Sequence, residues 1–315
     1  MSHSAFTHDL FDDDAASDYT PRAARARKAP PRRKLTEYSE GEQVLGSVTM
    51  TYQPARYEEV WLKSSLRDFF TQQYITDVLA QVKGGKEASV YRCAAAPHMG
   101  VEWLAAKVYR PRMFRNLRND AMYREGRAIL TSAGSAAKKT DHRLMRAIGK
   151  KTEFGMQASH TSWLMYEFVT LQTLFAAGAN VPQPIAAGEN AILMGYRGDG
   201  SRAAPTLSEI TLDDDEAPRL FDEVLRNIAL LLGIGYIHGD LSAYNILYWE
   251  GEVTLIDFPQ VTAAAENPNA AFILRRDITR VCDYFAHYGV RRDPAQLTAE
   301  LWREYVGEED FAQLP

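Results

Sequence analysis

Two aspartates and one asparagine lie within the stretch YIHGDLSAYNILYWEGEVTLIDFPQ, which covers residues 236–260. Four residues separate Asp240 from Asn245, and Asp257 follows twelve positions after Asn245. Phosphoryl transfer needs one carboxylate to receive a proton, and an amide and a second carboxylate to hold a hard cation. The order of these residue types therefore predicts a phosphoryl-transfer centre. A lone His-Gly-Asp tripeptide is equally typical of a polar turn at a helix end, so the prediction depends on the whole set.

The segment between Asn245 and Asp257 has the pattern of a β-hairpin. Residues 246–249 and 252–256 are short strand-like runs, and a Glu-Gly turn sequence lies between them. A hairpin brings its two ends together. We therefore expect Asn245 and Asp257 at the same end of this small sheet.

The motifs HGDLSAYNIL and IDFPQ resemble those of the RIO family of atypical protein kinases. In that family Gly replaces the Arg of the usual His-Arg-Asp motif, and Asp-Phe-Pro replaces Asp-Phe-Gly. The resemblance extends from about Val78 to about Val290. It implies ATP and Mg²⁺, or alternatively Mn²⁺, as cofactors, with Asn245 and Asp257 as metal ligands. It also implies that Asp240 orients and deprotonates the acceptor, and leaves open that Asp257 itself accepts the phosphate.

The composition is that of a soluble globular protein of enzyme size. The chain has 315 residues, 46% hydrophobic and 24% charged, which suits a two-lobed enzyme or two modest domains. Its formal net charge of −5 argues against general nucleic-acid binding by the whole molecule. A local basic patch remains compatible with that charge.

The cysteines and the hydropathy pattern both indicate a cytoplasmic protein. Cys93 and Cys282 lie far apart without metal-ligand or redox spacing, so we expect buried free thiols in a reducing compartment. No apolar run is long enough to span a bilayer, and the N-terminus lacks a basic-then-apolar signal pattern. We therefore expect no membrane partner.

The family resemblance implies an α+β, two-lobed, protein-kinase-like fold. A basic tail over residues 1–45 is expected to precede a small antiparallel-sheet lobe over 46–195 and a mostly helical lobe over 196–315. The tail contains PRAARARKAPPRRKL, which has no apolar face, so we expect disorder. Such a tail either docks on RNA phosphates or only solvates the protein.

Apolar periodicity predicts the elements of the first lobe, namely a helix over 57–72 and strands over 75–82, 88–94 and 101–109. Gly84 and Gly85 at the first turn allow backbone amides to approach phosphate oxygens. A Gly-Gly pair between strands is more often only a hairpin turn.

Two motifs in this lobe resemble nucleotide-binding motifs of the family. GKEASVY resembles its phosphate-binding loop, which implies nucleotide contacts for Gly85, Lys86 and Ser89. AAKVY resembles the strand whose lysine, here Lys107, binds the inner phosphates. An ammonium group at an inward strand position is costly to bury unless an anion meets it. The alternative is a lysine that reaches water from a strand edge.

Glu167 is the predicted carboxylate partner of Lys107. It lies in WLMYEFVTLQTLFA, residues 163–176, whose three-to-four apolar spacing predicts a helix. Its Glu-Phe-x-x-Leu pattern resembles a helix of the family, although a Tyr and a Thr replace a Lys and an Asn of that motif. The alternative is a position on the solvated face of the helix.

An insertion over residues 110–162 separates the lysine strand from this helix, and it is rich in Arg, Lys and small residues. The resemblance implies a flexible segment here, as in the first RIO subfamily, and this one departs from what is expected of eukaryotic members. The insertion either forms partly helical structure that contacts substrate or phosphates, or is a mobile surface loop without a ligand.

The connection between the lobes is expected at Met194-Gly195-Tyr196, after strands over 185–187 and 191–194. The resemblance implies that the backbone of Met194 and Tyr196 pairs with the adenine edge. A buried strand would have the same pattern.

Helices are predicted over 221–235 and 271–287 in the second lobe. Only about a dozen residues follow Gln260 before the second of these helices begins. Such a short activation segment leaves no room for the peptide-docking helices of ordinary kinases, so we do not expect recognition of an extended peptide.

The sequence thus predicts a serine/threonine protein kinase of RIO type, which transfers phosphate to a protein acceptor, including itself, or to water as a slow ATPase. One alternative is a small-molecule kinase of the aminoglycoside or choline type, which shares His-Gly-Asp, Asn and Ile-Asp. Another is an ATP-switched assembly factor that binds ribosomal RNA or pre-ribosomal particles. An inactive scaffold is disfavoured because no expected catalytic position is substituted.

Overall fold

The computed structural model describes residues 50–85, 87–110, 128–138 and 141–307. The tail over 1–45, Lys86, and residues 111–127 of the insertion lie outside this part, so what the sequence predicts for them stays a prediction. Along the described ranges, no helix has the length and apolar character that crossing a bilayer requires.

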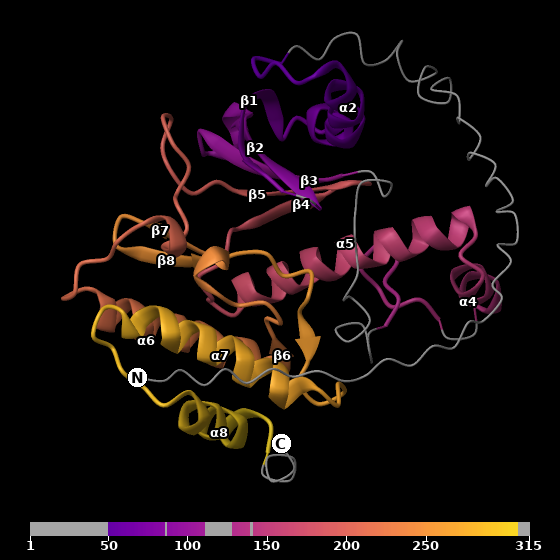
Figure 1. The fold of residues 1–315 in the computed structure, drawn as a ribbon. Coiled ribbons are helices and arrows are strands. Elements are labelled where there is room, and N and C mark those ends of the chain that lie inside the picture. Colours follow the sequence, from indigo (N-terminus) through magenta and orange to yellow (C-terminus); the bar gives the residue numbers. More distant parts are fainter. Residues whose placement is uncertain (1–49, 86, 111–127, 139–140, 308–315) are drawn as a thin grey trace, which may run out of the picture. The chain divides into compact units, whose positions relative to one another are not determined.

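The fold is α+β, with an antiparallel five-stranded sheet and a helical C-terminal region, consistent with the expected kinase fold (Figure 1). The sheet has the order β1-β2-β3-β5-β4 and contains β1 (Ile75–Gly84), β2 (Ala88–Ala95), β3 (Trp103–Tyr109), β4 (Pro184–Ala187) and β5 (Ala191–Gly195). The longer helices are α2 (Arg56–Thr71), α4 (His142–Gly149), α5 (Glu153–Ala176), α6 (Ala217–Gly233), α7 (Ala270–Ala286) and α8 (Pro294–Tyr305).

Short elements complete the described part of the chain. Two pairs of strands form small sheets: β6 (Tyr236–Ile237) with β9 (Thr262–Ala263), and β7 (Ile246–Trp249) with β8 (Glu252–Leu255). Single turns of 3₁₀ helix are η2 (Pro97–Met99), η4 (Leu207–Glu209) and η5 (Ala243–Asn245).

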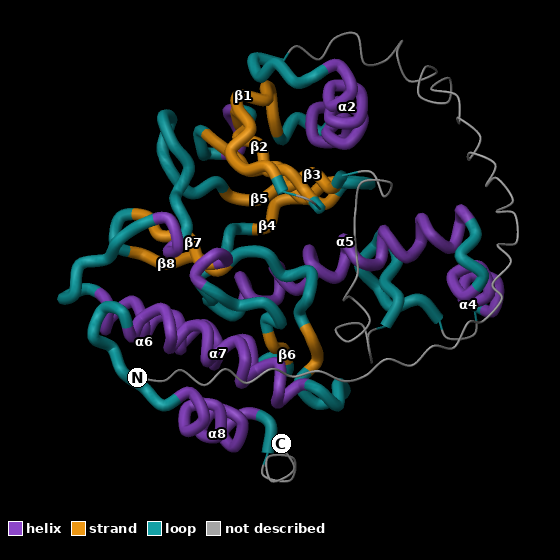
Figure 2. The backbone as a smooth tube through the Cα atoms, in the orientation of Figure 1, coloured by secondary structure: helices purple, strands orange, loops and turns teal. Residues whose placement is uncertain are grey.

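The two faces of the large sheet pack on different helices, because successive side chains of a strand point to opposite faces. On one face, Leu66 of α2 packs in a buried cluster with Tyr91 and Val108. On the other face, Phe168 of α5 packs in a cluster with Ile192. Figure 2 shows α2 and α5 on opposite sides of the strands. A side chain on the α5 face therefore lies between the sheet and the helix that carries Glu167.

The helical C-terminal region has its own core. Helices α6, α7 and α8 and the β7–β8 hairpin bury a common cluster that includes Phe221, Leu255, Phe285 and Trp302. Helices α6 and α7 contact each other, and α6 also contacts β8 (Figure 1). This core supports the hairpin that carries Asn245 and Asp257.

Most predicted elements are present, with ends shifted by a few residues. The main differences lie in the insertion, where α4 forms and α5 begins at Glu153, well before the predicted start at Trp163. The described part of the insertion is thus partly helical, and its predicted contact with substrate or phosphates stays a prediction. Helix α8 and the β6–β9 pair were not predicted. The lobe boundary between residues 195 and 196 stays a prediction.

Candidate active site

Lys107 lies in β3 on the face of the sheet that packs on α5. Its register neighbours are Val90 on β2 and Ile192 on β5, and Ile192 belongs to the cluster on that face. The Lys107 Nζ donates to Glu167 Oε1 at 2.5 Å and to Asp257 Oδ1 at 2.6 Å. One ammonium group thus joins α5 to the end of the β7–β8 hairpin. The predicted pairing of Lys107 with Glu167 is present.

Glu167 is a buried carboxylate with two donors. Its residue is 4% exposed, which excludes the alternative of a solvated helix face. The hydroxyl of Tyr109, also in β3, donates to the second carboxylate oxygen of Glu167. Because both oxygens have partners, Glu167 is held in one orientation toward Lys107.

Electrostatics keep this group of side chains charged. Burial disfavours the charge of Lys107, but the carboxylates of Asp257 and Glu167 outweigh it and raise the pKa of the ammonium. Burial also opposes ionisation of Asp257, yet the Lys107 charge holds the pKa of the Asp257 carboxyl below its ordinary value. At neutral pH, Lys107 is therefore a cation and Asp257 an anion.

The hairpin brings Asn245 and Asp257 together as predicted. Its turn residues Glu250 and Gly251 both have positive φ, 51° and 83°, the backbone that a two-residue hairpin loop favours. Strands β7 and β8 pair from Ile246 to Trp249, and the Ile256 amide donates to the Asn245 carbonyl at 3.0 Å. Asp257 follows directly after this last bond.

Asn245 and Asp257 fit a Mg²⁺ site by the chemistry of their donors. The Asn245 Nδ2 donates to the Asp240 carbonyl at 2.8 Å, so the amide oxygen is the atom left for a cation. The Asp257 side chain is 43% exposed and its φ is +72°, a backbone that aspartate tolerates better than most residues. Amide and carboxylate oxygens are the ligands that Mg²⁺ prefers.

The His-Gly-Asp segment is tied to the hairpin through His238. Its Nδ1 lies 3.3 Å from the Asp240 amide, and its Nε2 lies 3.1 Å from the Ile256 carbonyl. A ring with its proton on Nε2 satisfies both contacts. His238 is 2% exposed, so it positions the two segments rather than meeting a ligand in solvent.

Helix α7 fixes Gly239, which was not foreseen from the sequence. The Asp277 carboxylate accepts from the Gly239 amide at 2.8 Å, and Arg276 donates to the Gly239 carbonyl. Burial raises the pKa of the Asp277 carboxyl, although Arg276 and the Gly239 amide oppose the shift. The available signal was an Arg-Arg-Asp run within an otherwise apolar helix.

Asp240 has a second partner on the same helix. Arg280 donates to Asp240 Oδ1 at 2.7 Å, and both side chains are partly exposed. Nothing in the sequence pattern pointed to Arg280, because the contact joins residues forty positions apart.

The phosphate-loop residues are placed differently from one another. Gly85 closes the β1–β2 turn with its amide on the Ala88 carbonyl at 2.9 Å, and a Cβ on Gly85 would lie 2.7 Å from that oxygen. Ser89 pairs with Val108, so its side chain points to the α2 face, away from Lys107. A phosphate contact by Ser89 would therefore use its backbone. Lys86 lies outside the described residues.

Met194 and Tyr196 lie at and just beyond the end of β5. Met194 pairs with Ala105 of β3, and the Tyr196 ring packs edge-on against Trp103 with centroids 6.2 Å apart. Burial raises the pKa of the Tyr196 hydroxyl, which donates to the Asp199 carbonyl at 3.3 Å. Their role as the adenine-binding connection stays a prediction.

The sequence also matches the model of a known protein family. The model of the RIO domain, RIO1, matches residues 122–297, more than half of the chain, and this range contains Glu167 and every polar residue of the hairpin site. The chain belongs to the RIO family.

Relatives of this RIO chain are named as serine/threonine-protein kinases. RIO-type serine/threonine-protein kinase Rio1 of Haloferax volcanii is 31% identical over 69% of this chain and 66% of its own length. Rio2 of Methanocaldococcus jannaschii is 35% identical over 47% of this chain and 56% of its own length. Serine/threonine-protein kinase RIO1 of Chaetomium thermophilum is 29% identical over 71% of this chain and 42% of its own length. The chain thus spans about two fifths to two thirds of the length of these relatives.

Proposed function

We propose that this RIO chain is an ATP-dependent serine/threonine protein kinase, of class EC 2.7.11.1, that phosphorylates a protein acceptor or, slowly, water. The observation that carries the proposal is the contact of Lys107 with both Glu167 and Asp257, beside a fixed His-Gly-Asp segment. Family membership and the printed names of the relatives support it.

In the proposed complex, the Lys107 ammonium binds oxygens of the inner phosphates of ATP. Glu167 keeps that ammonium in place, because its two oxygens hold Lys107 and Tyr109 at once. The Gly85 turn lets backbone amides approach the phosphates. The backbone of Met194 and Tyr196 is the proposed adenine contact.

Asp240 is the proposed group that orients and deprotonates the acceptor hydroxyl. The acceptor oxygen bonds to the γ-phosphorus as the bond to the β,γ-bridging oxygen breaks, the hydroxyl proton passes to Asp240, and ADP leaves. Asn245 and Asp257 would hold Mg²⁺, which neutralises charge that builds on the transferred group. An acyl phosphate on Asp257 is a second fate for the phosphoryl group.

The experiment that tests this proposal maps the phosphate after incubation with Mg-[γ-³²P]ATP. Phosphoserine on the chain or on an added protein supports the kinase, an acid-labile acyl phosphate on Asp257 supports that intermediate, and free phosphate alone supports an ATPase. If the label remains in ATP under all conditions, the proposal is wrong. A panel of aminoglycosides and choline tests the small-molecule alternative, which the protein-kinase names of the relatives do not favour.

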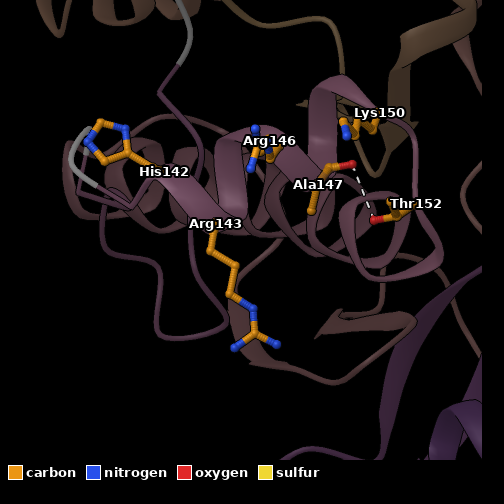
Figure 3. A pocket seen from close by; sticks show the side chains of 6 residues that line it. All are labelled: His142, Arg143, Arg146, Ala147, Lys150 and Thr152. Atoms are coloured by element: carbon orange, nitrogen blue, oxygen red, sulfur yellow. Dashed lines mark hydrogen bonds between the residues drawn. The ribbon is translucent and has the colours of Figure 1, made fainter.

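A second candidate function, nucleic-acid binding, is favoured by a basic cavity at α4. The cavity has a volume of about 480 Å³ and is lined by His142, Arg143, Arg146, Ala147, Lys150 and Thr152 (Figure 3). All four basic side chains are exposed, and none forms an ion pair with a described carboxylate. Arg146 lies one helical turn from Lys150, so like charges meet there unless an anion binds.

An aromatic side chain lies beside these cations. The Arg143 guanidinium lies 5.9 Å from the centroid of the Phe154 ring, and Phe154 is 55% exposed. Cations that meet phosphates next to a ring that stacks on a base are the groups that bind single-stranded nucleic acid. This surface, together with the basic tail, is the proposed contact for RNA such as that of a pre-ribosomal particle.

Fluorescence anisotropy with a single-stranded RNA oligonucleotide tests this candidate. Replacement of Arg143, Arg146 and Lys150 by Gln should weaken binding and reduce the slope of log affinity against log salt by about 2. The matched control replaces Arg291, Arg292 and Arg303, which are exposed outside this cavity. Equal losses in the two triple variants would contradict a specific contribution from α4.

The cytoplasmic location remains part of the proposal. Cys93 and Cys282 are both free and buried, as expected of thiols that stay reduced. Burial raises the pKa of the Cys282 thiol to about 11, which keeps it protonated and unreactive at neutral pH.

A further inference from the structure

Helix α7 presents three polar side chains to the His-Gly-Asp segment, and they act on different groups. Arg276 and Asp277 bind the carbonyl and the amide of Gly239, so they fix the backbone. Arg280, one helical turn after Arg276, instead meets the carboxylate of Asp240. Arg280 is therefore the member of this group that touches the proposed catalytic side chain.

The Arg280 guanidinium keeps the capacity to bind a second anion. One of its terminal nitrogens donates to Asp240 Oδ1 at 2.7 Å, and the side chain is 41% exposed. A guanidinium has five donors in a planar fork. Among the described residues, Asp240 is the side chain with which it forms an ion pair, so with 41% of its side chain exposed the remaining donors are accessible to a ligand.

Arg280 approaches Asp240 from a different element than the groups assigned to the nucleotide. Lys107 comes from the sheet and Asp257 from the hairpin, whereas Arg280 comes from α7. The segment between Asp257 and α7 is short, so it offers no long loop for acceptor contacts. Among the described residues, groups close to Asp240 itself are therefore placed to recognise the acceptor.

Two exposed aromatic side chains lie on the elements that carry or flank this ion pair. Tyr244, in η5 between Asp240 and Asn245, is 70% exposed, and Phe272, in the first turn of α7, is 52% exposed. Helix α7 contacts η5. Exposed aromatic rings together with an arginine are typical of surfaces that bind a protein chain.

We propose that Arg280 determines which protein acceptor is used, by binding an acidic side chain next to the hydroxyl that receives the phosphoryl group. The proposal rests on the protein-kinase function proposed above. Asp240 and Arg280 then work as a pair, in which the carboxylate faces the hydroxyl and the guanidinium faces the neighbouring carboxylate of the acceptor. The favoured acceptor is a serine in an acidic peptide.

Synthetic peptides test this assignment. Three peptides of equal length carry one serine flanked by Asp, by Asn or by Lys, and kcat/KM is measured for each with Mg-ATP. The wild type should favour the Asp peptide over the Asn peptide by about tenfold, the effect of one charge-assisted hydrogen bond. Because the ratio compares two peptides on one enzyme, a general effect of a variant on Asp240 cancels.

Variants at residue 280 should change that ratio in a defined order. Arg280→Gln should bring the ratio of kcat/KM for the Asp peptide to that for the Asn peptide close to one. Arg280→Lys should retain part of the preference for the Asp peptide, and Arg280→Glu should shift the preference to the Lys peptide. Arg275→Gln is the matched control, because Arg275 is exposed on the same helix and forms no ion pair with Asp240. Thermal unfolding checks that each variant is folded.

The outcomes separate this inference from the proposed function. An unchanged ratio in Arg280→Gln, an equal loss in Arg275→Gln, or no preference in the wild type would overturn the role of Arg280 while the kinase remains. If the wild type transfers phosphate to no peptide or protein, the protein-kinase part of the proposed function is wrong and the inference with it.

Discussion

Lys107 shares its charge between two carboxylates that differ in burial. The side chain of Glu167 is 6% exposed and also bound by Tyr109, whereas that of Asp257 is 43% exposed. The buried partner is held by packing and hydrogen bonds, and the exposed partner is the one that can exchange Lys107 for another cation. This asymmetry supports a structural role for Glu167 and a ligand role for Asp257.

Glu167→Gln should weaken Mg-ATP binding strongly, since it takes from the Lys107 ammonium the buried carboxylate that holds it in place. Tyr109→Phe should have a smaller effect, about 1–2 kcal/mol, because it removes a hydrogen bond and leaves the ion pair intact. Isothermal titration with Mg-ATP measures both. A Kd of Glu167→Gln for Mg-ATP close to that of the wild type would contradict the role of Glu167.

The lowered pKa of Asp257 gives a dependence of stability on pH. The pKa of Asp257 is lower in the folded state than in the unfolded chain, so its ionisation stabilises the fold at pH values at and above the unfolded pKa. This contribution is lost as the pH falls through the folded pKa. The unfolding free energy of the wild type minus that of Asp257→Asn should therefore rise with pH up to about pH 5 and then stay flat. Urea titrations from pH 3 to pH 7 measure it.

The control for this series is Asp222→Asn, which removes an exposed aspartate of α6 that forms no ion pair with a described residue. The unfolding free energy of the wild type minus that of Asp222→Asn should vary less with pH. A difference for Asp257→Asn that does not depend on pH would argue against a charge interaction with Lys107.

The residues that form the site could largely be predicted from the sequence, whereas the residues that hold them in place could not. Asp240, Asn245 and Asp257 stand in a fixed order along the sequence, so motif spacing identified them. Asp277 and Arg280 act through contacts made only after α7 packs on residues 239–240. The face of the sheet on which Ser89 lies was also missed, because it depends on the strand register.

At the scale of elements, the sharp turn at Gly239 determines where Asp240 lies. Gly239 has φ +86°, and a Cβ there would lie 2.2 Å from the Gln260 carbonyl oxygen. The chain before the hairpin and the chain after it therefore approach closely at this point. Only glycine allows both the backbone conformation and the approach.

Gly239→Ala should destabilise the fold more than Gly235→Ala. Gly235 also has positive φ, +81°, but a Cβ there would meet nothing within 4 Å, so its substitution should cost only the backbone term of about 1–2 kcal/mol. Urea unfolding of the two variants compares them directly. Equal losses of stability would show that the close approach to Gln260 does not matter.

Periodicity predicted the long elements and failed for the short ones. Helices α6 and α7 bury one apolar face, which gives a clear repeat. Strands β6 and β9 have two residues each, too few for any repeat. The first turn of α5 exposes its apolar side chains Phe154 and Met156, so it lacks a buried apolar face that a repeat would reveal. Its signal was the cap, where the Thr152 hydroxyl accepts from the Gly155 amide at 3.2 Å.

At the scale of the whole molecule, the decisive contact joins residues 150 positions apart, from Lys107 in the sheet to Asp257 after the hairpin. Neither periodicity nor turn chemistry predicts such a contact. The family resemblance supplied it, since it implied that a lysine and two carboxylates meet at one nucleotide. The described contacts agree with that arrangement. The acceptor and its recognition by Arg280 are proposed.

The release and transfer of the γ-phosphate from Mg-ATP by wild type and by Asp240→Ala is the most direct test. If Asp240 orients and deprotonates the acceptor, the variant should turn over at least about a hundredfold more slowly while binding Mg-ATP with similar affinity. Equal turnover by the two proteins would contradict the account.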